Sequence, residues 1–155
     1  MRFRIFLRRG LKSIPRDAWA AVVLVAGALA GQDITLTHVR PSDITTVIER
    51  MASSGVGIER INNTSLRVKG CPDLRPQDIP TSPFPGFPTD MQAQFTVLMT
   101  QAEGTSIITE TIFDRRFSHI NELLRLGANI EVTGDKAIVR GRTPLSGAET
   151  TATDL

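Results

Sequence analysis

The residue best placed to do chemistry is Asp90, in the segment 84–95 that reads Phe-Pro-Gly-Phe-Pro-Thr-Asp-Met-Gln-Ala-Gln-Phe. The prolines before it fix the backbone φ angle and predict an extended approach. A helix is expected from Met91, capped by Thr89 or Asp90. Asp90 therefore stands where a rigid segment turns into a helix, which gives its carboxylate the fixed direction that a general base needs. The alternative is that Asp90 serves only as the N-cap of that helix.

A second group that could act on a substrate is the pair Arg115 and Arg116, in the segment 111–117. A guanidinium group forks onto a carboxylate or phosphate through parallel hydrogen bonds, so such a pair suits an anionic substrate. A solvated run of charges is the alternative interpretation.

Composition argues against several other chemistries. The chain has 155 residues, a net charge of +2 and 41% apolar residues, which is ordinary for a globular domain and implies no polyanionic partner such as nucleic acid. Cys71 is the only cysteine, so no internal disulfide is possible, and we expect a small, half-buried residue there. With His38 and His119 as the only histidines, a zinc site is not expected.

The elements that must position these residues recur along the chain. Four residues of the first half recur at a constant offset of 73, namely Pro15, Asp17, Ala20 and Gly31 as Pro88, Asp90, Ala93 and Gly104. The segments 18–30 and 91–102 are therefore expected to be equivalent buried helices. Arg8 and Arg9 before an apolar run also resemble a twin-arginine export signal. An export signal has no reason to share register with an interior helix, and the run is too short to span a membrane.

Each copy is expected to continue with a strand, an amphipathic helix and a β-hairpin, after a leading strand within 1–9 and 74–82. Residues rich in β-branched side chains predict the strands 33–37 and 106–110. The helices are expected to begin at the caps Ser42 and Ser118 and to end at Gly55 and Gly127. The hairpins are expected to pair 58–61 with 66–69 around Asn62-Asn63, and 130–133 with 137–140 around Gly134-Asp135.

The two copies differ in length at one place. The second copy holds three extra residues between its strand and its helix, within 111–117. An enlarged loop on a regular scaffold is where functional residues tend to lie, which favours a binding role for the arginine pair.

The amino-acid sequence of these segments resembles that of a known family. Residues 87–95, Phe-Pro-Thr-Asp-Met-Gln-Ala-Gln-Phe, closely resemble a signature of the UDP-N-acetylglucosamine 1-carboxyvinyltransferases, which are enolpyruvyl transferases. The resemblance covers the chain from about Pro80 to its last residue and is weaker before that. Further blocks follow in the family's order and spacing, at 102–113, 116–117, 122–123, 126–130, 145–148 and 152–155.

The resemblance implies an α/β fold of α+β repeats. The family has two domains, each built from three repeats with helices inside and sheets outside. This chain would form a partial enolpyruvyl-transferase inside-out α/β barrel of about two βαβαββ-type repeats. The first repeat unit would cover 1–73, the second 74–142, and 143–155 would begin a truncated third, all within one partial domain. The chain is expected to be a fragment of a longer protein.

The resemblance also implies a reaction. The family transfers the enolpyruvyl group from phosphoenolpyruvate to the 3-hydroxyl of UDP-N-acetylglucosamine, the first committed step of peptidoglycan synthesis, and no cofactor or metal follows from this chemistry. Asp90 matches the aspartate that contacts the sugar hydroxyl and acts as base. Arg116 matches an arginine that binds the phosphoenolpyruvate carboxylate. Other substrate-binding positions are matched by Ile112, Phe113, Asp154 and Leu155.

Partners and compartment follow from the same resemblance. The expected partners are the two substrates and the missing second domain, without nucleic acid or membrane, in the cytoplasm. The isolated chain is expected to be inactive, because the family's lysine and cysteine loop are absent from it.

Two alternatives remain open. A 5-enolpyruvylshikimate-3-phosphate synthase is expected to show a Lys-Glu-Ser-Asp-Arg-like run where 113–117 read Phe-Asp-Arg-Arg-Phe. A non-catalytic paralogue that keeps the nucleotide-sugar surface is favoured by 15–22, where Pro-Arg-Asp-Ala-Trp-Ala-Ala-Val replaces the family's Pro-Asp-Arg-Ile-Glu-Ala-Gly-Thr. In addition, Arg115 stands where the family commonly has asparagine.

Overall fold

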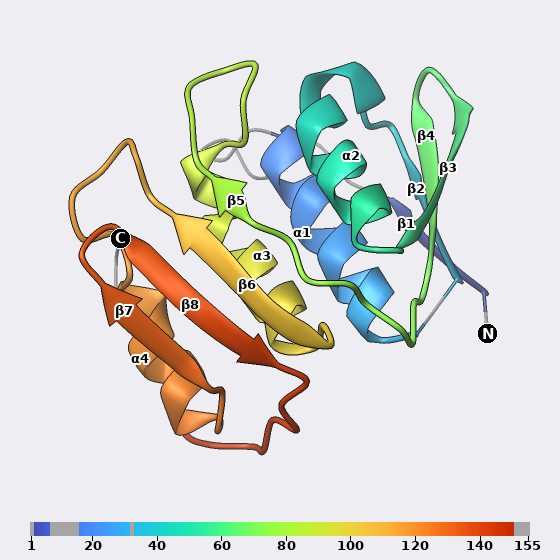
Figure 1. The fold of residues 1–155 in the computed structure, drawn as a ribbon. Coiled ribbons are helices and arrows are strands. Elements are labelled where there is room, and N and C mark those ends of the chain that lie inside the picture. Colours follow the sequence, from blue (N-terminus) through green and yellow to red (C-terminus); the bar gives the residue numbers. More distant parts are fainter. Residues whose placement is uncertain (1, 7–15, 32, 151–155) are drawn as a thin grey trace. The chain divides into compact units, whose positions relative to one another are not determined.

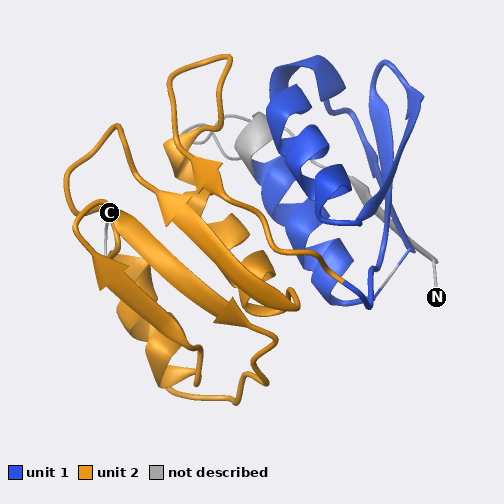
Figure 2. Ribbon diagram, in the orientation of Figure 1, with its two compact units in different colours: residues 1–73 blue, residues 74–155 orange. Residues whose placement is uncertain are grey.

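The structure is a computed structural model that describes residues 2–6, 16–31 and 33–150. It consists of two compact units, Met1–Asp73 and Leu74–Leu155, which are coloured separately in Figure 2. Each unit has its own sheet and its own buried core.

Unit 1 is a four-stranded sheet with two helices on one face (Figure 1). Its strands lie in the order β1-β2-β4-β3, with β1 parallel to β2 and the other pairs antiparallel. Helix α1 packs on β2 and β4, and fully buried Leu24, Leu36 and Leu66 lie in this core. The elements are β1 (Arg2–Phe6), α1 (Arg16–Leu29), β2 (Asp33–Thr37), the 3-10 helix η1 (Pro41–Ile44), α2 (Thr45–Ser53), β3 (Gly57–Asn62) and β4 (Ser65–Lys69).

Unit 2 repeats this plan. Its strands lie in the order β5-β6-β8-β7, again with one parallel pair at the start and antiparallel pairs after it. Helix α3 packs against β6 and β8, with Phe95, Leu98 and Met99 fully buried. The elements are β5 (Ile79–Pro80), the 3-10 helix η2 (Thr89–Met91), α3 (Gln92–Thr100), β6 (Gly104–Thr109), α4 (Ser118–Arg125), β7 (Ile130–Thr133) and β8 (Lys136–Gly141).

The predicted α/β repeat is confirmed by the same order of α-helices and strands in the two units, which differ in where their 3-10 helix lies. The predicted helix 18–30 is α1, and it belongs to the core of its unit in the way that α3 belongs to the other. The structure assigns no helix or strand to the described residues 142–150, and a truncated third unit from 143 stays a prediction.

One detail of the repeat was wrong. In β2, buried Ile34 and Leu36 pair with Val68 and Leu66 of the first hairpin. In β6, buried Ser106 and Ile108 pair with the equivalent residues of the second hairpin, Val139 and Ala137. Equivalent residues of the two strands are therefore 72 positions apart rather than 73. The helices that follow do not keep the expected offset of 76, because α2 and α4 begin 73 positions apart, at Thr45 and Ser118, and end 72 apart, at Ser53 and Arg125. The connection from β6 to α4 is therefore one residue longer than the connection from β2 to α2, rather than three.

The predicted helix caps were also wrong. No side-chain hydrogen bond caps α2, α3 or α4, and a 3-10 helix precedes both α2 and α3. Helical turns therefore begin before the residues expected to cap them. Ser42 donates to the Asp43 carboxylate instead, and Ser118 is already the first residue of α4. Thr89 and Asp90 lie inside η2.

The helix ends and hairpins follow the predictions more closely. Gly55 and Gly127 lie just past α2 and α4 with φ angles of 93° and 95°, a left-handed conformation that glycine adopts without strain. Gly134-Asp135 forms the second hairpin turn as predicted. The first turn lies one residue later than predicted, at Asn63-Thr64, because Asn62 still pairs with Ser65 in the sheet.

In the part of the chain that the structure describes, no helix is long and apolar enough to cross a bilayer. Cys71 is a free, half-buried thiol, as predicted.

Candidate active site

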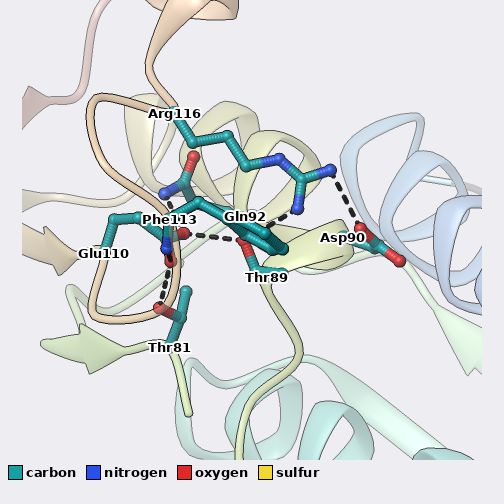
Figure 3. Close-up of polar contacts among 7 residues, drawn as sticks. All are labelled: Thr81, Thr89, Asp90, Gln92, Glu110, Phe113 and Arg116. Atoms are coloured by element: carbon teal, nitrogen blue, oxygen red, sulfur yellow. Dashed lines mark hydrogen bonds and ion pairs between the residues drawn. The ribbon is translucent and has the colours of Figure 1, made fainter. Parts of the chain in front are cut away.

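The candidate site lies in unit 2, where the end of β6 meets η2 and the loop before α4. Glu110 directly follows β6, while Thr89 and Asp90 come from η2 and Arg116 from the loop. Figure 3 shows their side chains converging, with Arg116 reaching across to Asp90. Three segments that are separate in the sequence thus meet within hydrogen-bonding distance.

Glu110 is the buried centre of this cluster. Only 4% of the residue is exposed, and its carboxylate accepts hydrogen bonds from three side chains and two backbone N–H groups. The donors are Thr81 Oγ1 at 2.9 Å, Thr89 Oγ1 at 2.7 Å, Gln92 Nε2 at 2.7 Å, Ile112 N at 2.8 Å and Phe113 N at 3.1 Å.

These hydrogen bonds decide the charge of Glu110. Burial by itself raises the pKa of a carboxyl group, because the charged form loses its hydration. The hydrogen bonds from Thr89, from the backbone of Ile112 and Phe113, and from Thr81 outweigh burial and hold the pKa of Glu110 below its ordinary value. Glu110 is therefore a fixed negative charge at neutral pH.

Thr89 connects this buried charge to the surface. Its hydroxyl donates to Glu110 and accepts a hydrogen bond from Arg116 Nη1 at 3.0 Å. Arg116 Nη2 in turn donates to Asp90 Oδ1 at 3.0 Å. The Arg116 guanidinium also lies 5.1 Å from the centre of the Phe113 ring, within the range of a cation–π interaction. The Arg116 side chain is held by three neighbours and is only 21% exposed.

Asp90 is the accessible end of the chain of contacts. Its side chain is 68% exposed, although it pairs with Arg116. A carboxylate beside a guanidinium group, with one face open, can accept a proton from a bound hydroxyl while the cation holds an anion next to it. This arrangement suits a reaction between a hydroxyl-bearing and an acidic substrate.

The residues before Asp90 are organised differently from the prediction. The segment 82–87 turns back on itself rather than running extended, with Ser82 N donating to Phe87 O and Gly86 N donating to Pro83 O. Phe87 is buried edge-on against Phe95, with ring centres 4.9 Å apart, and only then does the extended Pro88 lead into η2. Aromatic packing at Phe87 therefore helps to anchor the segment before Asp90.

The structure brings together some of the predicted site residues. Asp90 and Arg116 form an ion pair, and Ile112 and Phe113 lie on the same loop, 36% and 54% exposed. Their backbone N–H groups face Glu110, so they are already used within the protein. Asp154 and Leu155 lie outside the described residues. Arg115 is exposed, and its backbone has a φ angle of 54°, in the left-handed region.

Sequence reasoning missed Glu110, Gln92 and Thr81, and treated Thr89 only as a cap. A signal for Glu110 was present, because side chains alternate along a strand. Ser106 and Ile108 are buried, so the next inward position is Glu110. A glutamate at such a position demands partners.

No group of three or more His, Cys, Asp or Glu side chains within the described ranges could hold a metal ion.

Comparison with known proteins assigns the class. The family model described as EPSP synthase (3-phosphoshikimate 1-carboxyvinyltransferase) matches residues 10–155. The chain belongs to this family of carboxyvinyl, or enolpyruvyl, transferases.

Curated relatives resemble the chain more specifically. It is 47% identical over 136 residues to a UDP-N-acetylglucosamine 1-carboxyvinyltransferase of Acidobacterium capsulatum, covering 88% of this chain and 31% of the relative. A protein of the same name from Koribacter versatilis is 47% identical over 142 residues, covering 92% of this chain and 33% of the relative. The chain thus spans about a third of the length of the curated relatives it matches.

Solved structures agree on the fold. The enolpyruvyl transferase NikO from Streptomyces tendae matches with a TM-score of 0.76 at 22% identity, covering 85% of this chain and 31% of that one. The EPSP synthase from Acinetobacter baumannii matches with a TM-score of 0.65 at 17% identity, covering 84% of this chain and 30% of that one. The predicted partial enolpyruvyl-transferase fold is confirmed by these matches.

Proposed function

We propose that this chain supplies part of the active site of a cytoplasmic enzyme that transfers the enolpyruvyl group from phosphoenolpyruvate to the 3-hydroxyl of UDP-N-acetylglucosamine, in the first committed step of peptidoglycan synthesis. The observation that carries the proposal is the Asp90–Arg116 pair, 3.0 Å between Oδ1 and Nη2, in a chain whose curated relatives bear that activity in their names.

The pair fits the two halves of the reaction. Arg116 binds the carboxylate of phosphoenolpyruvate, with Phe113 against its guanidinium group. Asp90 takes the proton of the sugar hydroxyl as its oxygen bonds to the central carbon of phosphoenolpyruvate, whose methylene carbon gains a proton. The resulting tetrahedral ketal then loses that proton and inorganic phosphate, which leaves the enolpyruvyl ether.

The decisive experiment is a chimaera, because the chain spans about a third of its relatives. The matching 136-residue segment of the Acidobacterium capsulatum relative is replaced by its counterpart from this chain. We expect phosphate release from phosphoenolpyruvate with UDP-N-acetylglucosamine as acceptor and none with shikimate 3-phosphate.

Each alternative has its own outcome in this assay. Turnover with shikimate 3-phosphate alone would favour a 5-enolpyruvylshikimate-3-phosphate synthase, which the family model's description allows. Binding of UDP-N-acetylglucosamine without phosphate release would favour a non-catalytic paralogue, for which the altered segment 15–22 argues. Either outcome would overturn the proposal.

A further inference from the structure

Glu110 has no part in the proposed reaction, and its surroundings need an explanation. The residue is 4% exposed, and its carboxylate oxygens accept five hydrogen bonds from the protein. A carboxylate offers about four lone-pair positions, so its acceptor capacity is saturated. Glu110 therefore cannot bind a substrate itself, and it acts only through its neighbours.

The most informative neighbour is the Thr89 hydroxyl, which has one proton to donate and lone pairs to accept with. Because its proton is committed to Glu110 Oε2 at 2.7 Å, the lone pairs face the other way. Arg116 Nη1 donates into one of them at 3.0 Å. The buried negative charge thus fixes the direction of the hydroxyl, and the hydroxyl fixes one edge of the guanidinium group.

Glu110 also holds the loop that carries the aromatic neighbour of Arg116. The N–H groups of Ile112 and Phe113 donate to Oε1, at 2.8 Å and 3.1 Å. The Phe113 ring then lies 5.1 Å from the guanidinium carbon of Arg116. Glu110 therefore supports Arg116 along two routes, one through Thr89 and one through the loop.

We propose that Glu110 is a positioning residue that holds Arg116 in its anion-binding orientation through the Thr89 hydroxyl and the 112–113 backbone. The assignment of the anion as the phosphoenolpyruvate carboxylate rests on the proposed function, whereas the positioning of Arg116 does not.

The pair Thr89→Val and Thr89→Ser tests the hydroxyl route. Valine keeps the shape and removes the hydroxyl, while serine keeps the hydroxyl. In both variants Glu110 retains its four other donors. Thr81→Val is the matched control, because Thr81 also donates to Glu110 but makes no contact with Arg116 that the structure records.

The first measurement uses the 155-residue chain and NMR relaxation of the Arg116 Nε–H group. We expect its order parameter to fall in Thr89→Val and to stay at the unsubstituted value in Thr89→Ser and Thr81→Val. Glu110→Gln should lower it as well, and hydrogen exchange of the Ile112 and Phe113 amides should accelerate. If Glu110→Gln fails to fold, the threonine variants decide the matter. An ordered Arg116 in Thr89→Val would overturn the proposal.

The second measurement uses the chimaera. Loss of one charge-assisted hydrogen bond to Arg116 should raise the KM for phosphoenolpyruvate about tenfold in Thr89→Val and leave the KM for UDP-N-acetylglucosamine unchanged. Equal rises in both KM values would indicate a general structural role and contradict the proposal. Arg116 could lose order in Thr89→Val while the chimaera turns over neither acceptor. That combination would refute the proposed function and leave the positioning role standing.

Discussion

Asp90 was interpreted either as a general base or as a helix N-cap, and the two interpretations predict different effects of substitution. Its side chain caps no helix, so substitution removes only an exposed ion pair with Arg116. Such pairs contribute about 0–1 kcal/mol to stability. Asp90→Ala in the chimaera should nevertheless lower kcat by on the order of 10²–10⁴, the usual loss for a general base.

Steady-state kinetics and urea unfolding of the same preparation measure both effects. Glu131→Ala is the matched control, because it breaks another exposed pair, with Arg140 at 2.8 Å, away from the site. A rate for Asp90→Ala no lower than that of Glu131→Ala would exclude Asp90 as the base.

His119 makes the stability of the chain depend on pH. Burial, followed by the positive charge of Arg116, lowers the pKa of His119 to about 4, and its Nε2 is buried without a hydrogen-bond partner among the described residues. In the unfolded chain a histidine takes up its proton near pH 6.5. The folded chain binds that proton only near pH 4, so stability is full above pH 6.5 and is lost as the pH falls toward 4.

Urea unfolding between pH 7 and pH 5 checks this dependence, and His119→Gln should flatten it. Glu110 does not interfere, because its pKa lies below the ordinary value of 4.5 and its contribution is lost only at lower pH. His38→Asn is the control at the exposed histidine. An unchanged pH slope in His119→Gln would contradict the assignment.

Arg115 lies in a backbone conformation that its side chain disfavours. Its φ angle is 54°, in the left-handed region that costs residues other than glycine and asparagine about 1–2 kcal/mol. Arg115→Asn should therefore raise the free energy of unfolding by about 1 kcal/mol. Arg115→Ala, which keeps the strain and removes the charge, should show no such gain in urea unfolding.

At the scale of elements, β8 approaches the backbone at the end of α3 very closely at Gly141. A Cβ atom at Gly141 would lie 2.2 Å from the Ala102 carbonyl oxygen and 2.8 Å from that of Met99. These are backbone atoms, so the sheet would have to move off the helix. Gly141→Ala should destabilise the chain by about 1–3 kcal/mol, as overpacking does.

Thermal or urea unfolding measures this loss. Gly147→Ala is the control, since a Cβ there would meet nothing within 4 Å. Equal stability of the two variants would mean that β8 can shift away from α3 without loss.

The strands, hairpins and helix ends were predictable because period-two patterns and glycines at positive φ are local signals. The caps were not, because serine and threonine compete with 3-10 turns of the backbone, and the backbone prevails at η1 and η2. Asp90 and Arg116 were named as candidates from their residue types and positions and were given roles by the family resemblance, but their ion pair, between residues 26 positions apart, was not predicted. Glu110 and its donors were missed, because a buried network is defined by contacts between distant segments.

At the scale of the whole molecule, we expect the 155-residue chain alone not to turn over substrate. It contains the Asp90–Arg116 pair but spans about a third of its relatives' length. An active site that closes around two substrates needs groups from both sides to exclude water. Phosphate release from phosphoenolpyruvate should be absent for this chain and appear on addition of the remaining portion of a relative. Turnover by the chain alone would mean that its own groups suffice.

The unequal connections after β2 and β6 have a consequence for how the two halves tolerate mutation. Counting from Leu36 and Ile108, the counterpart of Glu110 in unit 1 is His38, which is exposed, whereas Glu110 is buried and accepts five hydrogen bonds. At this position the second copy is thus constrained by a buried polar network, whereas the first presents a side chain to solvent. In a library of single substitutions, changes at polar positions should therefore be tolerated in residues 33–45 and selected against in residues 105–121, although the two segments occupy equivalent places in the repeat.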